Sequence, residues 1–559
     1  MQDYKKVFHL IIKRTSKLNL IFIIFFTFLV AMFESAQLFF IFSIISDLSS
    51  AERNHDFIKL FGVYDFDRIQ FYIFAIICSL LAGFLLILSI IYTGLVAAKI
   101  ATKTTVDLFN TLADANYDIA KYSSREEYQQ AIAKEGDTLS IGVLNPWFQI
   151  HIRLFSLIFI FIALSIYDIN ATIIAMLIVV AGYFAYLLLV KDFINKFNIK
   201  KTILSTERLQ LVSSVIFGKR DVYIYKLGPK LKELISNKST EYFRGYAILH
   251  IIGLIPRFIF ESFFIALICI FVLISFIYKE SFSIASFGVI GIASLRILPI
   301  FQALFGNYAT IKGHIYCIDF FNKLELDSEK NANFFKSKIN KLDHKRISSI
   351  KNIKLENISI KSSNNIEIIS KKNFYFQSGK KYLIQGPSGS GKSTLIDALI
   401  GLVPIQSGNI FVDGNKINTI SQINTDLFSV VSQKVNIFEG TIKYNITFHE
   451  DDEIDIERLN HVIEVSKIND YLPSLEKGLD SIISETGSKL SGGQLQRIAI
   501  ARALYKKSNV LILDEATNGL EESLEMKILD AIEESYQGII IYISHNSSYR
   551  TRVDELINI

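Results

Sequence analysis

The stretch KYLIQGPSGSGKST, residues 381–394, decides the fold of the second half of the chain. Its first five residues favour a buried strand, and the run LIDALI that follows the stretch favours a helix. Glycines between the strand and the helix let backbone N–H groups close around phosphates, and the start of the helix adds positive potential. The stretch therefore predicts a phosphate-binding loop in a mixed α/β nucleotide-binding domain, which we expect to begin near residue 351.

Two pairs of neighbouring polar residues, Lys392 with Ser393 and Asp514 with Glu515, suggest the chemistry of this domain. Lys392 would reach the β- and γ-phosphates of a nucleotide, and the hydroxyl of Ser393 would ligate Mg²⁺. The apolar run NVLILDEAT ends in Asp514 and Glu515. We expect Asp514 to hold Mg²⁺ through water and Glu515 to polarise the attacking water.

Three further segments lie around these two in a fixed order. The segment LSGGQ, residues 490–494, precedes the helical run LQRIAIARAL. Gln433 lies in VVSQKVNIFEGTI, and His545 follows the strand-like GIIIYIS. Read together, the five motifs are the Walker A loop, a glutamine loop, a signature segment, a Walker B strand and a histidine switch.

With these motifs in this order, residues 351–559 resemble the ATPase domain of an ABC transporter. The resemblance implies ATP and Mg²⁺ as cofactors and Glu515, His545 and Gln433 as catalytic residues. It places Mg²⁺ on Ser393, Gln433 and Asp514. It implies that ATP is bound by Gly386, Pro387, Ser388, Gly389, Ser390, Gly391, Lys392, Ser393, Thr394, Ser491, Gly492, Gly493 and Gln494.

The resemblance also implies a dimer. In the family geometry, Ser491 and Gly493 face the γ-phosphate held by the Walker A loop of another chain, so one copy cannot complete its own ATP site. Since both motifs are intact here, we expect a homodimer.

The sequence departs from the family pattern at three places. Ser362 stands about where an aromatic residue usually stacks on adenine, so another residue is expected to take that role. The segment after Walker B reads Asn518-Gly-Leu-Glu521, where the acidic charge of the last position is kept. The chain ends at Ile559, soon after His545, and we expect the usual final strand to be missing.

The first half of the chain has a different composition. Half of the 559 residues are hydrophobic, and they gather in long runs before residue 310. A membrane-spanning helix needs about 20 mostly apolar residues. Six segments meet this need, at residues 18–46, 70–98, 143–167, 170–192, 247–277 and 283–309. We therefore expect a multi-domain membrane protein, with an all-α transmembrane domain of six helices at 1–320, a linker at 321–350 and the ATPase domain at 351–559.

The basic residues set the orientation. Lysines and arginines crowd the N-terminal segment, and the short link at 167–170 carries none, which puts the N-terminus and the two long polar links in the cytoplasm. The long apolar run from residue 18 is a first span rather than a cleavable signal peptide. The six-span pattern resembles an exporter-type half-transporter of the bacterial inner membrane, whose coupling helices would lie near 117–127 and 217–227.

Other classes are disfavoured by composition. A net charge of +5 is small for this length and gives no case for nucleic-acid binding. The three cysteines are far apart and form no CxxC pair, which argues against a disulfide framework or a zinc site.

Ionisable residues in membrane spans are costly to bury and serve as candidates for contact with the cargo. Arg257 and Arg296 suit a lipid pyrophosphate, whereas Glu34 and Glu261 could contact the cargo or brace a nearby arginine. An internal Arg257–Glu261 pair is the structural alternative. Arg153, at the cytoplasmic end of its span, is expected to lie at the interface. The candidates in the six spans are Glu34, His151, Arg153, Arg257, Glu261 and Arg296.

The contexts IPRFIFES (255–262) and LRILP (295–299) are similar to bacterial lipid-linked oligosaccharide flippases. The resemblance implies ATP-driven flipping or export of a lipid-linked oligosaccharide, or a similar lipid-anchored glycan, from the cytoplasmic side. The alternative is export of a peptide or hydrophobic drug by the same architecture. No cysteine-peptidase domain is seen before the first span, which disfavours the kind that processes bacteriocins.

Overall fold

The computed structural model divides the chain into two compact units. The first contains the described residues up to 326, and the second those from 349 onward. The structure describes residues 2–49, 68–113, 125–167, 169–278, 284–326, 349–361, 367–387, 389–403, 405–417, 425–449, 453–484 and 490–559. The expected boundary at residue 320 falls within the last helical turns of the first unit, which continue to residue 326.

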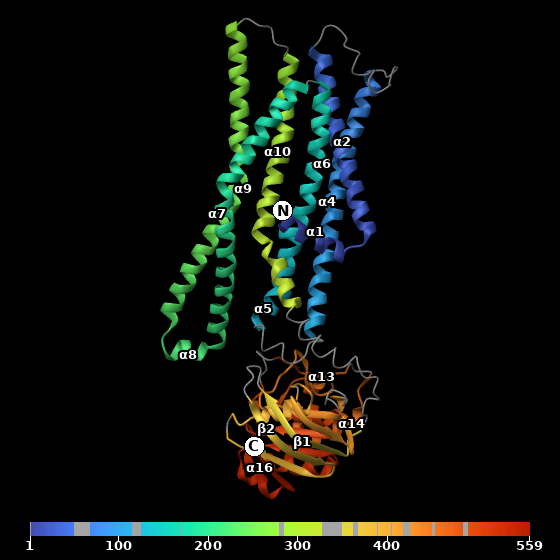
Figure 1. Ribbon diagram of the computed structural model, residues 1–559, viewed down its shortest axis with the longest axis vertical. Coiled ribbons are helices and arrows are strands. Elements are labelled where there is room, and N and C mark those ends of the chain that lie inside the picture. The colour runs from blue at the N-terminus through green and yellow to red at the C-terminus, as the bar shows by residue number, and fades with distance from the viewer. Residues whose placement is uncertain are drawn as a thin grey trace. The chain divides into compact units, whose positions relative to one another are not determined.

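The first unit is built from long helices that run side by side (Figure 1). Their bounds are α1 (Gln2–Arg14), α2 (Lys17–Ser49), α4 (Arg68–Ala113), α5 (Arg125–Gln130), α6 (Asn145–Tyr167), α7 (Ile169–Phe217), α8 (Lys219–Ile224), α9 (Gly228–Tyr278) and α10 (Ile284–His314), with π-helical segments η2 (Ala131–Glu135) and η3 (Thr138–Leu144) leading into α6. Each expected span lies in one of six long helices, α2, α4, α6, α7, α9 and α10.

Four stretches among the described residues are long and apolar enough to cross a membrane. They are Lys17–Gln37, Tyr72–Ala113, Thr138–Ser165 and Gly228–Phe263. The expected spans at 170–192 and 283–309 lie in α7 and α10, so each coincides with a helix but not with one of these four stretches. Many large apolar side chains of the long helices are exposed, as expected for surfaces that face lipid.

The structure describes the whole of one expected coupling segment, 217–227, but only the end of the other, 117–127. Most of 117–127 lies outside the described residues, apart from the start of α5. The segment 217–227 contains the short helix α8 at the turn between α7 and α9 (Figure 1). No residue of α8 is buried, and Tyr223 is 86% exposed.

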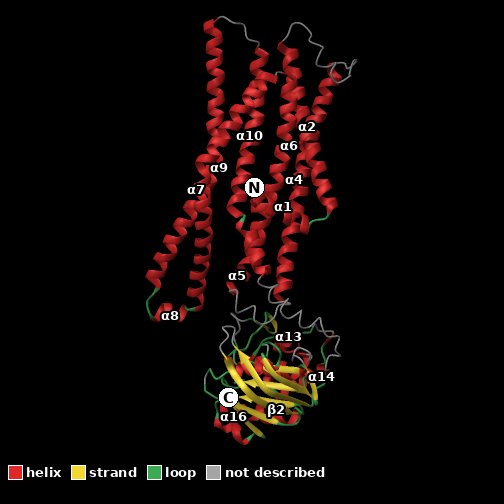
Figure 2. Cartoon of the chain, viewed as in Figure 1, coloured by secondary structure: helices red, strands yellow, loops and turns green. Residues whose placement is uncertain are grey.

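The second unit has a five-stranded parallel sheet in the order β11-β3-β10-β9-β6 and a four-stranded antiparallel sheet in the order β2-β1-β4-β5 (Figure 2). The strands are β1 (Asn352–Lys361), β2 (Glu367–Gln377), β3 (Lys381–Gln385), β4 (Ser407–Val412), β5 (Asn415–Ile417), β6 (Phe428–Val431), β7 (Gly440–Thr441), β8 (Ile482–Ile483), β9 (Val510–Asp514), β10 (Ile539–Ile543) and β11 (Glu555–Asn558). The helices are α12 (Lys392–Leu399), α13 (Ile442–Thr447), α14 (Ile456–Val465), α15 (Gly492–Tyr505) and α16 (Glu522–Ser535).

The central parallel strands β9 and β10 are buried on both faces, which explains their apolar sequences. Side chains alternate between the faces of a strand. In β9, Leu511 and Leu513 pack with the helices α13 to α16, whereas Val510 and Ile512 pack with α12 and the antiparallel sheet. The second unit is therefore layered around one central sheet, as the alternation of apolar strands and helices predicts.

The final strand that we expected to be missing is present. β11 pairs in parallel with β3, directly before the phosphate loop. The guanidinium of Arg550 donates two hydrogen bonds to Gln385 Oε1, at 3.1 and 3.0 Å. The short C-terminal segment therefore forms the edge strand of the sheet. The prediction was wrong because four residues are too few to show the alternation of apolar and polar side chains that marks a strand.

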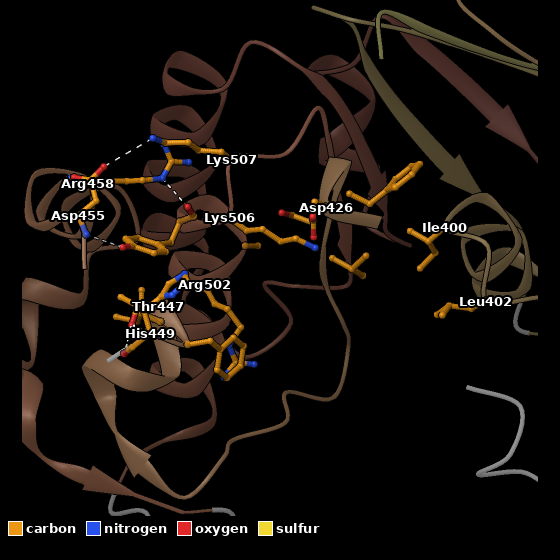
Figure 3. Close-up of a pocket in the computed structure, with 17 residues that line it drawn as sticks. Ile400, Leu402, Asp426, Thr447, His449, Asp455, Arg458, Arg502, Lys506 and Lys507 are labelled. Carbon is orange, nitrogen blue, oxygen red and sulfur yellow. Dashed lines mark hydrogen bonds and ion pairs between the residues drawn. The ribbon is translucent and has the colours of Figure 1, made fainter. Parts of the chain in front are cut away.

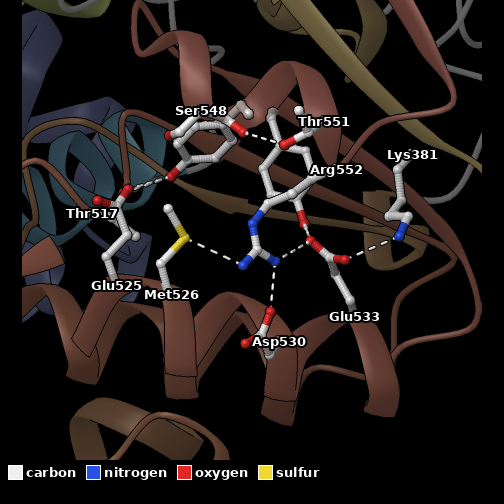
Figure 4. A network of polar contacts seen from close by, with 11 residues as sticks. Lys381, Thr517, Glu525, Met526, Asp530, Glu533, Ser548, Thr551 and Arg552 are labelled. Atoms are coloured by element: carbon white, nitrogen blue, oxygen red, sulfur yellow. Dashed lines mark hydrogen bonds and ion pairs between the residues drawn. The ribbon is translucent and has the colours of Figure 1, made fainter. Parts of the chain in front are cut away.

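A polar network joins the segment after Glu515 to α16 and to the C-terminal segment (Figure 4). Glu525 accepts hydrogen bonds from Thr517 Oγ1 and from Tyr549 OH, both at 2.6 Å. Glu533 accepts from Lys381 Nζ at 3.0 Å and from Arg552 at 3.3 Å. Burial raises the pKa of Tyr549, so its hydroxyl stays protonated and keeps donating.

Removing the Tyr549 hydroxyl tests this network. We expect Tyr549→Phe to lower the free energy of unfolding of the ATPase unit by about 2 kcal/mol, because a buried hydrogen bond to a carboxylate is lost. Calorimetry of the purified chain measures this loss as a lower melting temperature. The transition to follow is the one whose melting temperature rises when ATP is added. Tyr375→Phe is the matched control because the Tyr375 side chain is 41% exposed. Equal melting temperatures in Tyr549→Phe and Tyr375→Phe would show that the network contributes nothing to stability.

Candidate functional site

The phosphate loop has the backbone that its glycines require. Gly389 and Gly391 have φ values of +81° and +98°, which L-residues with a side chain rarely adopt. A Cβ on Gly391 would lie 2.4 Å from Ile368 Cγ2, and one on Gly386 would lie 2.7 Å from the Ile559 carbonyl oxygen. The loop is thus closed on itself between β3 and α12, and only glycine fits at these positions.

Lys392 and Ser390 point to a ligand for this loop. The Lys392 side chain is buried, and its Nζ donates to the carbonyl oxygens of Gly386 and Pro387 at 2.9 and 3.0 Å, which holds the ammonium group over the loop. Ser390 Oγ is buried and has no hydrogen-bond partner among the described residues. Because an orphaned buried hydroxyl is costly, Ser390 fits a loop whose polar atoms are completed by phosphate oxygens.

Glu515 lies at the carboxyl end of β9 and is the centre of the site. Its Oε2 accepts hydrogen bonds from Gln433 Nε2 at 2.5 Å and from Asn518 Nδ2 at 2.8 Å. His545 Nε2 lies 3.6 Å from Glu515 Oε1. The three predicted catalytic residues therefore meet, and the Glu515 side chain is only 15% exposed.

The backbone at Glu515 is unusual. Its φ of +47° is in the left-handed region, which is uncommon for a residue with a side chain. A backbone hydrogen bond from Glu515 N to the Ile543 carbonyl oxygen, at 3.0 Å, holds it there. Strained conformations of this kind gather at functional sites, which agrees with a catalytic carboxylate.

Asp514 precedes Glu515 and can serve as a metal ligand. Burial raises its pKa, the carboxylates of Glu515 and Asp397 raise it further, and Lys392 lowers it. A divalent cation would relieve this crowding of negative charge. Mg²⁺ usually takes one or two carboxylates, a hydroxyl and phosphate oxygens, so Asp514 and the hydroxyl of Ser393 are of the right kind to hold it.

The signature segment forms the start of α15. Ser491 caps this helix, since its Oγ accepts from Gln494 N at 3.3 Å while its own N–H donates to Gln494 Oε1 at 2.7 Å. The reciprocal pair is a capping box. The helix N-terminus of Gly492 and Gly493 then offers N–H groups to an anion. Among the described residues, no hydrogen bond joins this segment to the phosphate loop of the same chain.

Two contacts near the site, made by Gln496 and by Asn518, were not predicted from the sequence. Gln496, which is buried, accepts a hydrogen bond from Gly519 N at 2.9 Å through its Oε1. The neighbouring Asn518 donates to Glu515, as described above. The departure at Asn518-Gly-Leu-Glu521 was visible in the sequence, but its contact with Glu515 depends on how the loop after β9 turns.

Two predicted residues lie outside the described part of the chain. They are Ser388 of the phosphate loop and Ser362, the position at which adenine stacking was in question.

A hollow of about 810 Å³ in the ATPase unit is separate from the predicted ATP site (Figure 3). Basic side chains of α14 and the end of α15 stand on one side of it, including Arg458 and Arg502. Burial lowers the pKa of Arg502 to about 10, and this arginine donates to the carbonyl oxygens of Asn445 and Asn436. None of the predicted ATP-binding residues lines this hollow.

The intramembrane charges fall into two groups. Glu34 is 8% exposed and pairs with Arg153 at 3.5 Å, so the carboxylate braces α2 against α6. Of the two roles expected for Glu34, this pair supports the brace to a nearby arginine. Arg257 and Glu261 approach to 3.7 Å along α9, as the i, i+4 alternative predicts, and both side chains remain more than 40% exposed. Arg296 is exposed and donates to Gln37 Oε1 at 3.1 Å.

His151 is the remaining candidate in the spans. Its Nδ1 lies 2.8 Å from the Trp147 carbonyl oxygen, its Nε2 contacts Tyr4 OH, and its ring lies against the Trp147 ring. These contacts assign His151 a packing role.

Comparisons with known proteins agree with this geometry. Residues 369–518 match the family model described as ABC transporter. An ATP-dependent lipid A-core flippase of Mannheimia succiniciproducens is 33% identical over 286 residues, which are 50% of this chain and 47% of that protein. A putative export ATP-binding/permease protein of Rickettsia bellii is 37% identical over 218 residues, 38% of each chain. The chain thus spans about half the length, or less, of these curated relatives.

A solved structure extends the likeness to the whole fold. The chain superimposes on a bacterial Atm1-family ABC exporter with ATP bound, with a TM-score of 0.72 and 18% sequence identity. The match covers 97% of this chain and 93% of that one. The long helices and the layered α/β unit therefore both have counterparts in the fold of that exporter.

Replacing Glu515 tests the arrangement around it. We expect Glu515→Gln to bind ATP but to lower the hydrolysis rate by about 10²- to 10⁴-fold, because the amide cannot accept a proton from water. Retained radiolabelled ATP and released phosphate, measured on the same purified sample, separate binding from turnover. Glu534→Gln is the matched control, since this exposed carboxylate on α16 makes no contact with Glu515 among the described residues. Hydrolysis by Glu515→Gln at the native rate would refute the general-base assignment.

Proposed function

We propose that this chain is an exporter-type ABC half-transporter, which works as an ATP-driven dimer that flips or exports a lipid-anchored glycan. The proposed cargo is a lipid-linked oligosaccharide or a similar molecule taken from the cytoplasmic side. The proposed location is the bacterial inner membrane, with the ATPase unit in the cytoplasm.

The single observation that carries ATP turnover is the group of side chains on the Glu515 carboxylate. Gln433, Asn518 and His545 orient this carboxylate from three different segments. A carboxylate fixed in this way can accept a proton from water as the water attacks the γ-phosphate. A domain that only binds nucleotide would need no such group.

The remaining residues of the site have supporting roles. Lys392 neutralises the β- and γ-phosphates, and the N–H groups of the loop and of α12 hold their oxygens. Ser393 and Asp514 would hold Mg²⁺, which supplies charge neutralisation on the transferred phosphate. We propose that Ser491 and Gly493 of a second copy complete each site, since among the described residues the signature segment makes no hydrogen bond to its own phosphate loop.

The nature of the cargo is supported by two observations. Some of the relatives are named lipid A-core flippases, and lipid A-core is a lipid that carries sugars. Arg257 and Arg296 remain exposed in the helical unit, although Arg257 pairs with Glu261 and Arg296 donates to Gln37, whereas the Arg153–Glu34 pair is more deeply buried. Two exposed cations at membrane depth suit the phosphate groups of such a lipid.

The second candidate is a peptide or hydrophobic drug exporter. It is favoured by the relatives named as putative export ATP-binding/permease proteins, which specify no lipid. A panel of polyprenyl-pyrophosphate glycans, peptides and hydrophobic drugs distinguishes the candidates by stimulation of ATPase activity in liposomes. We expect stimulation by the glycolipids, and stimulation by peptides or drugs alone would transfer the function to the second candidate.

Neutralising both exposed arginines tests the proposed cargo contact. We expect Arg257→Gln with Arg296→Gln to lower lipid flipping at least about ten-fold, because each lost charge-assisted hydrogen bond contributes about 1.5–3 kcal/mol. Basal ATPase activity should remain. A fluorescent polyprenyl-pyrophosphate glycan in proteoliposomes reports the flipping rate.

The matched control is Arg244→Gln, an exposed arginine on the same helix α9 with no ion pair among the described residues. Flipping at the native rate by the double variant, with normal ATPase activity, would exclude Arg257 and Arg296 as cargo contacts.

A further inference from the structure

The helix α1 has three distinct faces. A helix repeats every 3.6 residues, so side chains four apart form a stripe. One stripe is buried against the helical unit, and it contains Val7, Leu10 and Ile11. A second stripe is apolar but exposed, by 43% to 51%, and contains Tyr4, Phe8 and Ile12. The third is exposed and basic, and contains Lys5, His9 and Lys13.

The exposed apolar stripe continues into the first membrane span. Only two residues separate Arg14, the end of α1, from Lys17, the start of α2. The first turns of α2 expose Leu18 and Ile21 by 63% and 65%. The apolar surface of α1 therefore leads directly into a surface that faces lipid, and α1 fits a helix that lies in the bilayer interface.

A cavity of about 740 Å³ opens between α1 and the helical turns at 318–326. Four cationic side chains line it together with one carboxylate, that of Glu325. The apolar part of the lining comes from both elements. The lining residues on α1 are Lys5, Lys6, Phe8, His9, Leu10, Ile12, Lys13 and Arg14.

Carboxylates hold two of these four cations, and the other two are accessible to a ligand. Lys6 pairs with Asp319 at 2.7 Å, and Arg14, whose side chain is 7% exposed, contacts Asp107 and Glu325. Lys13 lies 3.5 Å from Glu325 and is 57% exposed, so this pair is loose and open to water. Lys5 has no ion pair among the described residues. The cavity thus has a fixed wall at Arg14 and two accessible cations at Lys5 and Lys13.

We propose that α1 and this cavity bind anionic phospholipid head groups of the cytoplasmic leaflet, with Lys5 and Lys13 on the phosphates and acyl chains along Phe8 and Ile12. Charge complementarity and the continuous apolar stripe favour an anionic lipid over a soluble protein partner. The inference rests on the part of the proposed function that places the chain in a bilayer and not on the cargo, so it can fail while the transport function stands.

The only tryptophan of the chain reports on this site. Trp147 packs against Tyr4 and Phe8 of α1, with ring centroids 5.4 and 6.3 Å apart. Lipids with brominated acyl chains quench tryptophan fluorescence at short range. The full-length chain in mixed lipid nanodiscs is titrated with brominated phosphatidylglycerol, which is anionic, or with brominated phosphatidylcholine, which is neutral overall. We expect stronger quenching by the anionic lipid, decreasing as salt is added.

The variant Lys5→Gln with Lys13→Gln should reduce the preference for phosphatidylglycerol about 30-fold, since each basic residue near a lipid surface contributes about a five-fold factor. The matched control is Lys416→Gln with Lys527→Gln, two exposed lysines of the ATPase unit that should leave the preference unchanged.

Three results would overturn the proposal. They are equal quenching of the native chain by the two lipids, no quenching by either lipid, and an unchanged preference in the Lys5/Lys13 variant. Size-exclusion profiles and basal ATPase activity, which should match those of the native chain, confirm that each variant is folded.

Discussion

Three side chains converge on the carboxylate of Glu515, and the order of the central sheet is what brings them together. Gln433 follows β6, Glu515 follows β9, and His545 follows β10. These strands are parallel neighbours, so their carboxyl ends meet at one edge. β3, on the other side of β10, delivers the phosphate loop to the same edge. The strands stay in this order because apolar side chains bury both of their faces.

The signature segment sets a second constraint. Its capping box closes the start of α15, and no described residue of the phosphate loop in the same chain takes part in it. The same helix holds the loop after β9 through Gln496 and Gly519, next to Asn518 and Glu515. The signature helix is therefore tied to the loop of its own chain that carries Glu515 and Asn518. In the proposed dimer, its N-terminus would complete the ATP site of another copy.

Much of this could be predicted from the sequence, because local patterns carry it. The phosphate loop depends on glycines at fixed spacing, the central strands on unbroken apolar runs, and the long helices on runs longer than a bilayer is thick. The structure places Lys392 and Glu515 as these patterns predict. The ATP and cargo roles of the individual residues remain predictions.

What the sequence did not predict depends on contacts between distant segments. The strand β11 is four residues long and is recognisable only through its pairing with β3. The Asn518–Glu515 bond requires the left-handed turn at Glu515. Glu34 was expected to contact the cargo or to brace an arginine, but its partner was not predicted, because Arg153 is 119 positions away on a different helix. No periodicity along the chain could have paired them.

The central claim is that two copies share each ATP site, and mixed dimers test it most directly. One copy carries Lys392→Ala and the other Ser491→Arg, with different affinity tags so that only mixed dimers are purified. A dimer of either variant alone has two defective sites, whereas the mixed dimer retains one site with an intact phosphate loop and an intact signature segment. The account predicts hydrolysis near background for each variant alone and a clear recovery in the mixed dimer. Background hydrolysis in the mixed dimer, or full hydrolysis by the Ser491→Arg chain alone, would contradict it.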